Sequence, residues 1–341
     1  MGNSWPAADA DTVVPREAFP STDGAVAGFA RSLGLPGYLD IHVHLLPHAL
    51  QRAVWDFFDR LEDPPWPVTY RDDEARRLAT LRELGVVAHT ALAYGHRPGV
   101  AAWCNQHTLA AADAHAQVIP TFTFFPEDGV GDDVGQALQR GGRIAKVHLQ
   151  VGRFHPDDPR LDPAWAQLVE ADVPALVHAG AGYGVEGGHE VCGPDGIRRL
   201  LRRFPGLRLV VAHLGAPDLR AFLALAEEAP QIHLDTAMML TDPPYLAAAP
   251  RDLLPRYAAL GERLLFGSDF PTIPHPYAAQ VRGLAALELT VQGLRGLLHD
   301  NAARLLGLPT AADRIGDPVA GVPVSGASRG DAGHEPPLSA P

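Results

Sequence analysis

The chain has 341 residues, a formal net charge of −12 at pH 7 and 2 cysteines. The acidic balance argues against a nucleic-acid partner, because phosphate binding needs clustered lysine and arginine. Two cysteines make neither a disulfide framework nor a zinc-finger pattern. No apolar run has the length of a membrane span, and no secretory signal opens the chain, so we expect a cytoplasmic protein that does not bind membranes.

Composition predicts three segments. Residues 1–34 form an N-terminal extension, of which the first 22 or so show little periodicity and are expected to lie loosely on the surface. Residues 35–309 form the folded domain. Residues 310–341 are rich in Gly, Pro, Ser and Ala, and we expect a disordered low-complexity tail.

The domain alternates short apolar runs with helical patterns. The runs expected to be strands are 38–44, 86–92, 118–124, 144–149, 175–178, 207–212, 232–235 and 264–267. Such alternation requires a parallel sheet, and eight units predict a closed (β/α)₈ barrel of the TIM type. The rival, an open doubly wound sheet, would place a Gly-rich phosphate loop after the first strand, where this chain has His42-Val43-His44.

Polar residues close several of these strands. In a strand, His42 and His44 point to the same side, and two imidazoles there make half of a divalent metal site. Later strands end at Lys146 and His148, His178, His213 and Asp269. Because barrel enzymes carry their catalytic groups at the carboxyl ends of the strands, we expect all of them to meet at one mouth.

Five motifs lie between residue 38 and about residue 307: Asp40-Ile41-His42-Val43-His44, Val177-His178-Ala179-Gly180, Val211-Ala212-His213-Leu214-Gly215, Leu265-Phe266-Gly267-Ser268-Asp269-Phe270-Pro271 and Asn301-Ala302-Ala303-Arg304-Leu305-Leu306-Gly307. Together they resemble the amidohydrolase superfamily, in the amidohydrolase-related branch that includes aminocarboxymuconate-semialdehyde-type decarboxylases. The resemblance implies a barrel with one or two metal ions. It implies that His213 positions or protonates the substrate, and that the metal ligands are His42, His44, His178 and Asp269.

These residues favour a metal-dependent hydrolase. A divalent ion, zinc by preference or else manganese, would bind a water molecule and lower its pKa from about 15.7 towards 7. Asp269 would act as general base, and His213 would polarise the carbonyl of an amide, ester or lactone in a small molecule. One alternative is a metal-dependent decarboxylase of an unsaturated or aromatic acid. Another is a non-catalytic barrel that binds a ligand. Self-association, if any, is expected to give a homodimer.

Lys146 is the only lysine among 28 basic residues. A lysine kept at a strand end of a chain that otherwise uses arginine suggests a catalytic amine, since lysine can lose its proton when buried. As an ammonium it would hold a substrate carboxylate or carbonyl. As a carbamate it would bridge two metal ions. We favour the ammonium, because the chain most resembles the mononuclear branch.

Further candidates lie near the expected mouth. Asp235, at the end of the seventh strand, is expected to orient a ligand histidine. Loops at this end of a barrel set specificity. Candidates for substrate contact are His148 and, in the loops, Trp66, His189 and His275.

Overall fold

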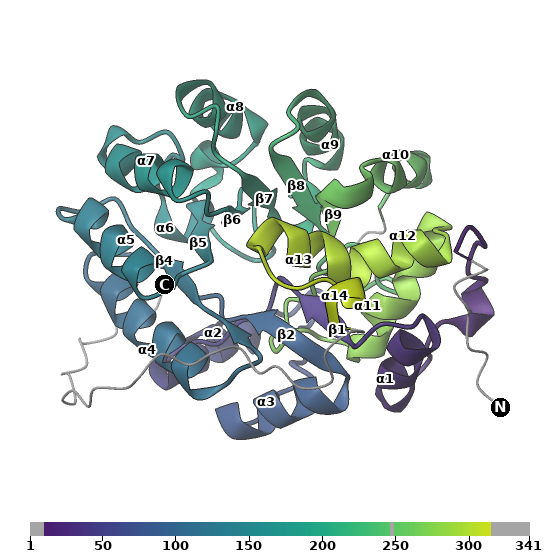
Figure 1. Ribbon diagram of the computed structural model, residues 1–341. Helices are drawn as coiled ribbons and strands as arrows, with labels where there is room; N and C mark the ends of the chain where they lie inside the picture. The colour runs from purple at the N-terminus through teal and green to yellow at the C-terminus, as the bar shows by residue number, and fades with distance from the viewer. Residues whose placement is uncertain (1–9, 246–248, 315–341) are drawn as a thin grey trace.

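The computed structural model describes residues 10–245 and 249–314, and its centre is a barrel of parallel strands (Figure 1). One ladder joins β1 to β3 and a second joins β4 to β9. β3 and β4 are the two halves of the strand predicted over 118–124, separated by Pro120, which has no N–H to donate. The strands are β1 (Tyr38–Asp40), β2 (Val86–Thr90), β3 (Val118–Ile119), β4 (Thr121–Thr123), β5 (Ile144–His148), β6 (Ala175–His178), β7 (Leu209–Val211), β8 (Ile232–Asp235) and β9 (Leu264–Leu265).

The barrel closes between β1 and β9. The Ile41 N–H donates to the Phe266 carbonyl at 3.1 Å, and Val43 pairs with Phe270 in a parallel bridge. With β3 and β4 counted as one strand, the wall has the eight strands of the predicted (β/α)₈ barrel, which is confirmed.

Helices surround the wall on its outer side (Figure 1). Within the described ranges, no helix is both long enough and apolar enough to cross a membrane. The helices are α1 (Asp23–Ser32), α2 (His48–Phe58), α3 (Glu74–Glu83), α4 (Val100–Ala114), α5 (Val130–Gln139), α6 (Leu149–Gly152), α7 (Asp162–Glu170), α8 (Pro194–Arg203), α9 (Leu219–Glu228), α10 (Leu254–Ala259), α11 (Tyr277–Gly283), α12 (Val291–Arg295), α13 (Asn301–Leu306) and α14 (Ala311–Arg314).

α8 shows why these segments are helical. It begins with Pro194, whose fixed φ suits the first helical position. Ile197, Leu200 and Leu201 are buried on one face, while its arginines lie towards solvent, so the segment is stabilised by packing one apolar stripe against the barrel.

The barrel interior has an apolar floor below a polar upper layer. Side chains from strands all around the wall, including Ile144 and Leu176, form one buried cluster that α13 joins through Ala302 and Leu306. Because side chains alternate along a strand, Lys146 and His148 follow Ile144 on the same face of β5. On β6, His178 follows Leu176 in the same way. Alternation thus places the polar groups above the floor.

Three local expectations need correction. Residues 10–22 are not loose: Val14 and Phe19 are buried, and the Val14 N–H donates to the Leu289 carbonyl at 3.2 Å. β1 ends at Asp40, so His42 and His44 follow the strand instead of ending it, although His44 still forms a bridge with Leu92.

The third correction concerns the tail. It was expected to begin at residue 310, but α14 is helical, and its Ala311 N–H donates to Oδ1 of Asp300 at 2.7 Å. The tail expected over 315–341 lies outside the described residues.

Candidate active site

Asp40 joins the end of β1 to the segment after β9. Its buried carboxylate accepts hydrogen bonds from the N–H groups of His42 (3.0 Å) and Ser268 (3.1 Å), and from the Tyr277 hydroxyl (2.9 Å). Burial raises the pKa of Asp40 to about 7, against the opposing effect of these hydrogen bonds. One carboxylate therefore holds together the segments that carry His42 and Asp269.

The backbone turns Asp269 towards His42. Asp269 has a φ of 65°, in the left-handed region that costs a non-glycine residue about 1–3 kcal/mol. Its N–H donates to the His42 carbonyl at 2.7 Å. Gly267 passes so close that an added Cβ would lie 2.7 Å from Cβ of His42. This close approach explains the glycine that precedes Ser268 and Asp269.

The Nε2 atoms of His42 and His44 both face Oδ1 of Asp269, at 3.5 and 3.0 Å. On the far side of each ring, Nδ1 of His44 lies 3.1 Å from the Leu92 carbonyl oxygen, and Nδ1 of His42 lies 2.9 Å from Oδ2 of Asp235. Since carbonyl and carboxylate oxygens accept, each Nδ1 carries a proton. In the neutral rings, both Nε2 atoms therefore present a lone pair to Asp269.

This arrangement fits a metal ion. Two nitrogen lone pairs and a carboxylate repel one another unless a cation lies between them. Within the described part of the chain, buried Nε2 of His42 has no hydrogen-bond partner. Burial, together with the charge of Lys146, lowers the pKa of His42 well below its usual value, which disfavours a proton there. Neutral imidazoles and a carboxylate suit zinc and similar divalent ions.

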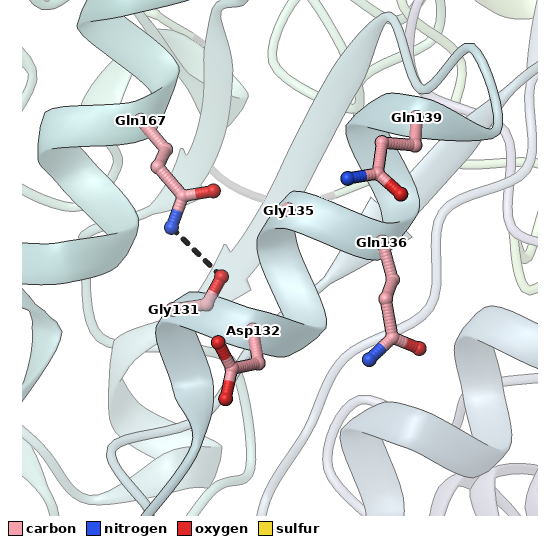
Figure 2. A pocket seen from close by; sticks show the side chains of 6 residues that line it. All are labelled: Gly131, Asp132, Gly135, Gln136, Gln139 and Gln167. Carbon is pink, nitrogen blue, oxygen red and sulfur yellow. Dashed lines mark hydrogen bonds between the residues drawn. The ribbon is translucent and has the colours of Figure 1, made fainter.

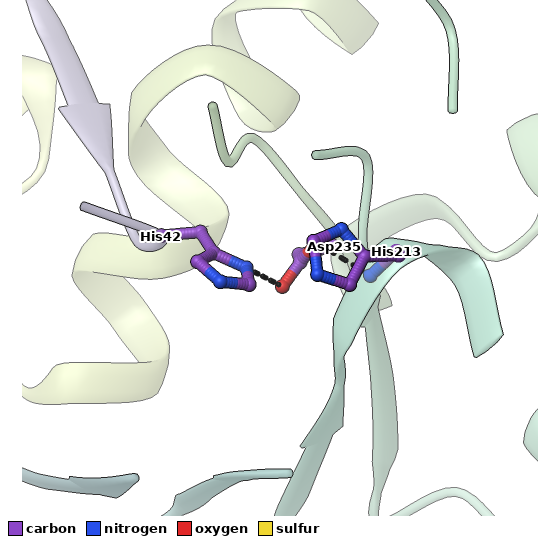
Figure 3. Close-up of side chains that lie close together, drawn as sticks. All are labelled: His42, His213 and Asp235. Atoms are coloured by element: carbon purple, nitrogen blue, oxygen red, sulfur yellow. Dashed lines mark hydrogen bonds and ion pairs between the residues drawn. The ribbon is translucent and has the colours of Figure 1, made fainter. Parts of the chain in front are cut away.

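Asp235 at the end of β8 anchors His213 as well as His42 (Figure 3). Its Oδ1 accepts from the N–H groups of His213 (2.9 Å) and Ala237 (3.1 Å). Nδ1 of His213 donates to the Ala237 carbonyl at 3.1 Å, so the Nε2 of its neutral ring also presents a lone pair. The His42 and His213 ring centroids are 4.8 Å apart. The predicted contact between Asp235 and a histidine of the site is therefore present.

Six rings form a closed circle at the carboxyl ends of the strands, which we call the aromatic circle. Neighbouring centroids are between 4.0 and 6.0 Å apart. The four histidines predicted at the mouth of the barrel, together with His148, are brought together in it. In order around the circle, the rings are His42, His44, Tyr94, His148, His178 and His213.

His178 lies between His148 and His213 in the aromatic circle. It pairs in register with His148 across β5 and β6, and the two rings stack at 4.0 Å with an angle of 9° between them. Its other neighbour is His213, with ring centroids 4.8 Å apart. In the residues that the structure describes, potential ligand atoms lie within 4.8 Å of one another in two sets, which are His42 with His44 and Asp269, and His42 with His213 and Asp235. His178 belongs to neither set.

Lys146 precedes His148 by two residues on the inner face of β5. It is fully buried, and Nζ has no hydrogen-bond partner in the described ranges. Burial lowers the pKa of Lys146 from 10.5 to about 8, while Asp235 and Asp269 act in the opposite direction. The amine can therefore gain or lose a proton in mildly alkaline solution.

Trp66 lies in an aromatic cluster. Its indole stacks on Phe58 (5.0 Å) and Tyr183 (5.5 Å), and meets the edge of Tyr245 at 5.4 Å. The indole N–H donates to the Thr272 carbonyl at 3.0 Å. Trp66 therefore ties together the loops that follow β1, β6, β8 and β9.

The two other loop histidines differ in position. His275 is buried, its Nδ1 donates to the Pro276 carbonyl at 3.1 Å, and its ring lies 6.4 Å from Tyr245 of the aromatic cluster. His189 begins a short 3₁₀ turn and is exposed, and no contact in the described ranges joins it to the aromatic circle. The structure therefore packs His275 against the aromatic cluster and leaves His189 exposed in the loop after β6.

Sequence reasoning missed two residues of the site. Asp40 had a usable signal, since it alternates with His42 and His44 in the same motif. Tyr94 had none, because its place depends on packing against His44 and His148, which are remote in sequence.

A separate hollow of about 410 Å³ lies outside the barrel at α5 and α7 (Figure 2). Nε2 of Gln167 donates to the Gly131 carbonyl there at 2.7 Å. The lining has a single carboxylate and no imidazole, so we assign it no chemistry. It consists of Gly131, Asp132, Gly135, Gln136, Gln139 and Gln167.

A parallel barrel with imidazoles and a carboxylate converging at the carboxyl ends of its strands defines the class of TIM-barrel metal enzymes. The chain belongs to the amidohydrolase family, whose model matches residues 39–308. It is therefore an enzyme of the amidohydrolase superfamily, whose members act on small molecules with a divalent metal, and its side chains include groups that could hold such an ion.

Solved structures share the fold. An uncharacterised TIM-barrel protein from Bordetella bronchiseptica is 20% identical, with a TM-score of 0.65 over 79% of this chain and 98% of that one. A 5-carboxyvanillate decarboxylase mutant from Novosphingobium aromaticivorans, solved with manganese, is 14% identical, with a TM-score of 0.58 over 80% and 97%. A 4-oxalomesaconate hydratase from Rhodopseudomonas palustris is 17% identical, with a TM-score of 0.51 over 82% and 97%. No curated protein sequence matches this chain.

Proposed function

We propose that the protein is a mononuclear zinc-dependent hydrolase of an amide, ester or lactone, with manganese as the alternative metal. The observation that supports this best is the convergence of Nε2 of His42 and His44 on Oδ1 of Asp269, with both Nδ1 atoms already donating. We propose His178 as the remaining ligand. When bound, the ion would act as a Lewis acid and lower the pKa of a water molecule.

Two side chains would handle the protons. The Asp269 side chain is 21% exposed at the mouth, so it can accept a proton from an attacking water, a role worth roughly 10²–10⁴ in rate. His213 is fixed at Nδ1, and its ring lies beside that of His42, with centroids 4.8 Å apart. In its protonated form it would donate to the substrate carbonyl oxygen and then to the leaving group. The Lys146 ammonium would hold an acidic group of the substrate.

Decarboxylation of an unsaturated or aromatic acid is the second candidate. The observation that favours it is the buried amine of Lys146, which has no hydrogen-bond partner in the described residues and could pair with a carboxylate. A decarboxylase is also among the proteins that share the fold.

One assay separates the candidates. Zinc-loaded and manganese-loaded protein is incubated with amides, esters and lactones, and in parallel with unsaturated and aromatic acids, while acid release and carbon dioxide release are both recorded. Hydrolysis without carbon dioxide is the expected result. Carbon dioxide release without hydrolysis would make decarboxylation the function.

We also propose that residues 35–309 are the catalytic domain, and that the enzyme is cytoplasmic, has no nucleic-acid partner and, if it associates, forms a homodimer. The family match over residues 39–308 supports the domain bounds, the net charge of −12 argues against nucleic acid, and the presence of only 2 cysteines fits a reducing compartment.

A further inference from the structure

Residues 180–188, which we call the strap, follow β6 and are fastened at their base by a side chain of α6. Oε1 of Gln150 accepts the Gly182 N–H at 2.5 Å, and Nε2 of Gln150 donates to the carbonyls of Val185 (3.1 Å) and Gly187 (2.8 Å). The Gln150 residue is 1% exposed. Both ends of the strap are therefore held by one buried amide.

The tip of the strap, between these two ends, is fastened to the loop after β1. The Tyr183 hydroxyl donates to the Asp63 carbonyl at 2.7 Å, with the Pro64 carbonyl 3.1 Å away. Next to it, an added Cβ at Gly184 would lie 2.6 Å from Cδ2 of Leu61, so the two loops are in direct contact. The tip is thus held by packing and by a single hydroxyl group.

The strap crosses the mouth of the barrel, because β1 and β6 lie on opposite sides of the wall (Figure 1). From β1, the wall leads to β6 through β2, the joined β3 and β4, and β5 on one side, and through β9, β8 and β7 on the other. A loop that begins at β6 and contacts the loop after β1 must span the distance between them. On its way, it passes beside the aromatic circle, since an added Cβ at Gly182 would lie 3.7 Å from Nε2 of His178.

We propose that Tyr183 makes the strap a gate that selects substrates by size. With the tip fastened, Lys146 is fully buried and the Asp269 side chain is 21% exposed, so a molecule that reaches both needs a wider opening. The tip is the part that opens, because the base has three hydrogen bonds to Gln150 whereas Tyr183 is half-buried. Loops at the mouth of an active site commonly gate entry in this way. The gate goes beyond the proposed function, since it acts on substrates of hydrolysis and of decarboxylation alike.

Lys146 reports access to the site, because it is buried and is the only lysine of the chain. The purified protein is treated with trinitrobenzenesulfonate, a bulky amine reagent, or with cyanate, a small one, and mass spectrometry measures the rate of labelling at Lys146. Tyr183→Phe keeps the ring and removes the hydroxyl. The matched control is Tyr257→Phe, which removes a buried hydroxyl that donates to the Leu219 carbonyl on the outer helices.

The readout is the ratio of the bulky rate to the small rate, which a general loosening of the fold would not raise. In Tyr183→Phe this ratio should rise about three- to tenfold, because one hydrogen bond that keeps the tip closed is lost. Tyr257→Phe should keep the wild-type ratio. The gate is overturned if the ratio does not rise in Tyr183→Phe, if it rises equally in Tyr257→Phe, or if neither reagent labels Lys146. The measurement involves no turnover, so a failure of the proposed hydrolysis leaves it intact.

Discussion

Oδ2 of Asp235 accepts a hydrogen bond from Nδ1 of His42 at 2.9 Å, and neither side chain is exposed to solvent. This contact fixes the His42 ring and leaves Nε2 free to face Asp269. Metal-binding histidines in general depend on such a partner for ring orientation and tautomer.

Asp235→Asn should weaken metal binding by about 10–100-fold. The amide can still accept from the His213 N–H, but its NH₂ group would face Nδ1 of His42 and favour the wrong tautomer. Competition with a chelating dye measures the change. Asp252→Asn, in an exposed pair with Arg220, is the control and should bind metal like the wild type. Equal metal affinity in both variants would show that Asp235 does not support metal binding.

His213→Asn should separate metal binding from proton transfer. The variant should keep most of its metal and lose about 10²–10⁴ in kcat, since a general acid is lost. The double variant His42→Ala with His44→Ala should lose the metal itself. Metal content and turnover are measured on the same samples. Near wild-type turnover in His213→Asn would refute its proposed role.

Lys146 can be observed alone, because the chain has no other lysine. With ¹³C-labelled lysine, metal-free protein should give one side-chain signal that titrates with a midpoint near 8. A bound divalent cation should move the midpoint lower still, by repelling the ammonium. A midpoint near 10.5 would contradict the burial of the amine, and a carbamate signal with two metals per chain would favour the bridging role.

The lowered pKa of Lys146 also predicts how the stability of the fold depends on pH. The pKa of Lys146 is about 8 in the folded chain and near 10.5 when unfolded, so between these values the unfolded chain binds more protons. The contribution of Lys146 to the free energy of unfolding should therefore rise from pH 8 towards pH 10.5. Urea unfolding of the wild type and of Lys146→Met across that range should show the rise in the wild type only.

Gly267→Ala should disturb the site through packing. The new Cβ would lie 2.7 Å from Cβ of His42, and such overpacking costs about 1–3 kcal/mol of stability. Gly24→Ala in α1 is the control, since an added Cβ there meets nothing within 4 Å. Thermal unfolding compares the two. A Gly267→Ala protein as stable as the control would show that the approach of the two segments is looser than described.

The barrel, and the meeting of most candidate site residues at one end of it, could be predicted from the sequence because both depend on periodicity. The period of two residues placed Lys146 and His148 on one face, and strand ends located Asp269. The sequence could not predict which ring nitrogen of each histidine carries the proton, since this depends on remote carbonyls such as those of Leu92 and Ala237. The burial of Val14 was missed for a similar reason, because a backbone hydrogen bond to another segment leaves no periodic signal.

The most direct test of the central claim is the metal content of the purified protein. Elemental analysis of the wild type should find about one divalent ion per chain, and the protein with His42→Ala and His44→Ala should contain none. Turnover of the metal-stripped wild type should return when zinc or manganese is added. A wild-type protein that contains no transition metal, and gains no activity from zinc, manganese or cobalt, would contradict the account.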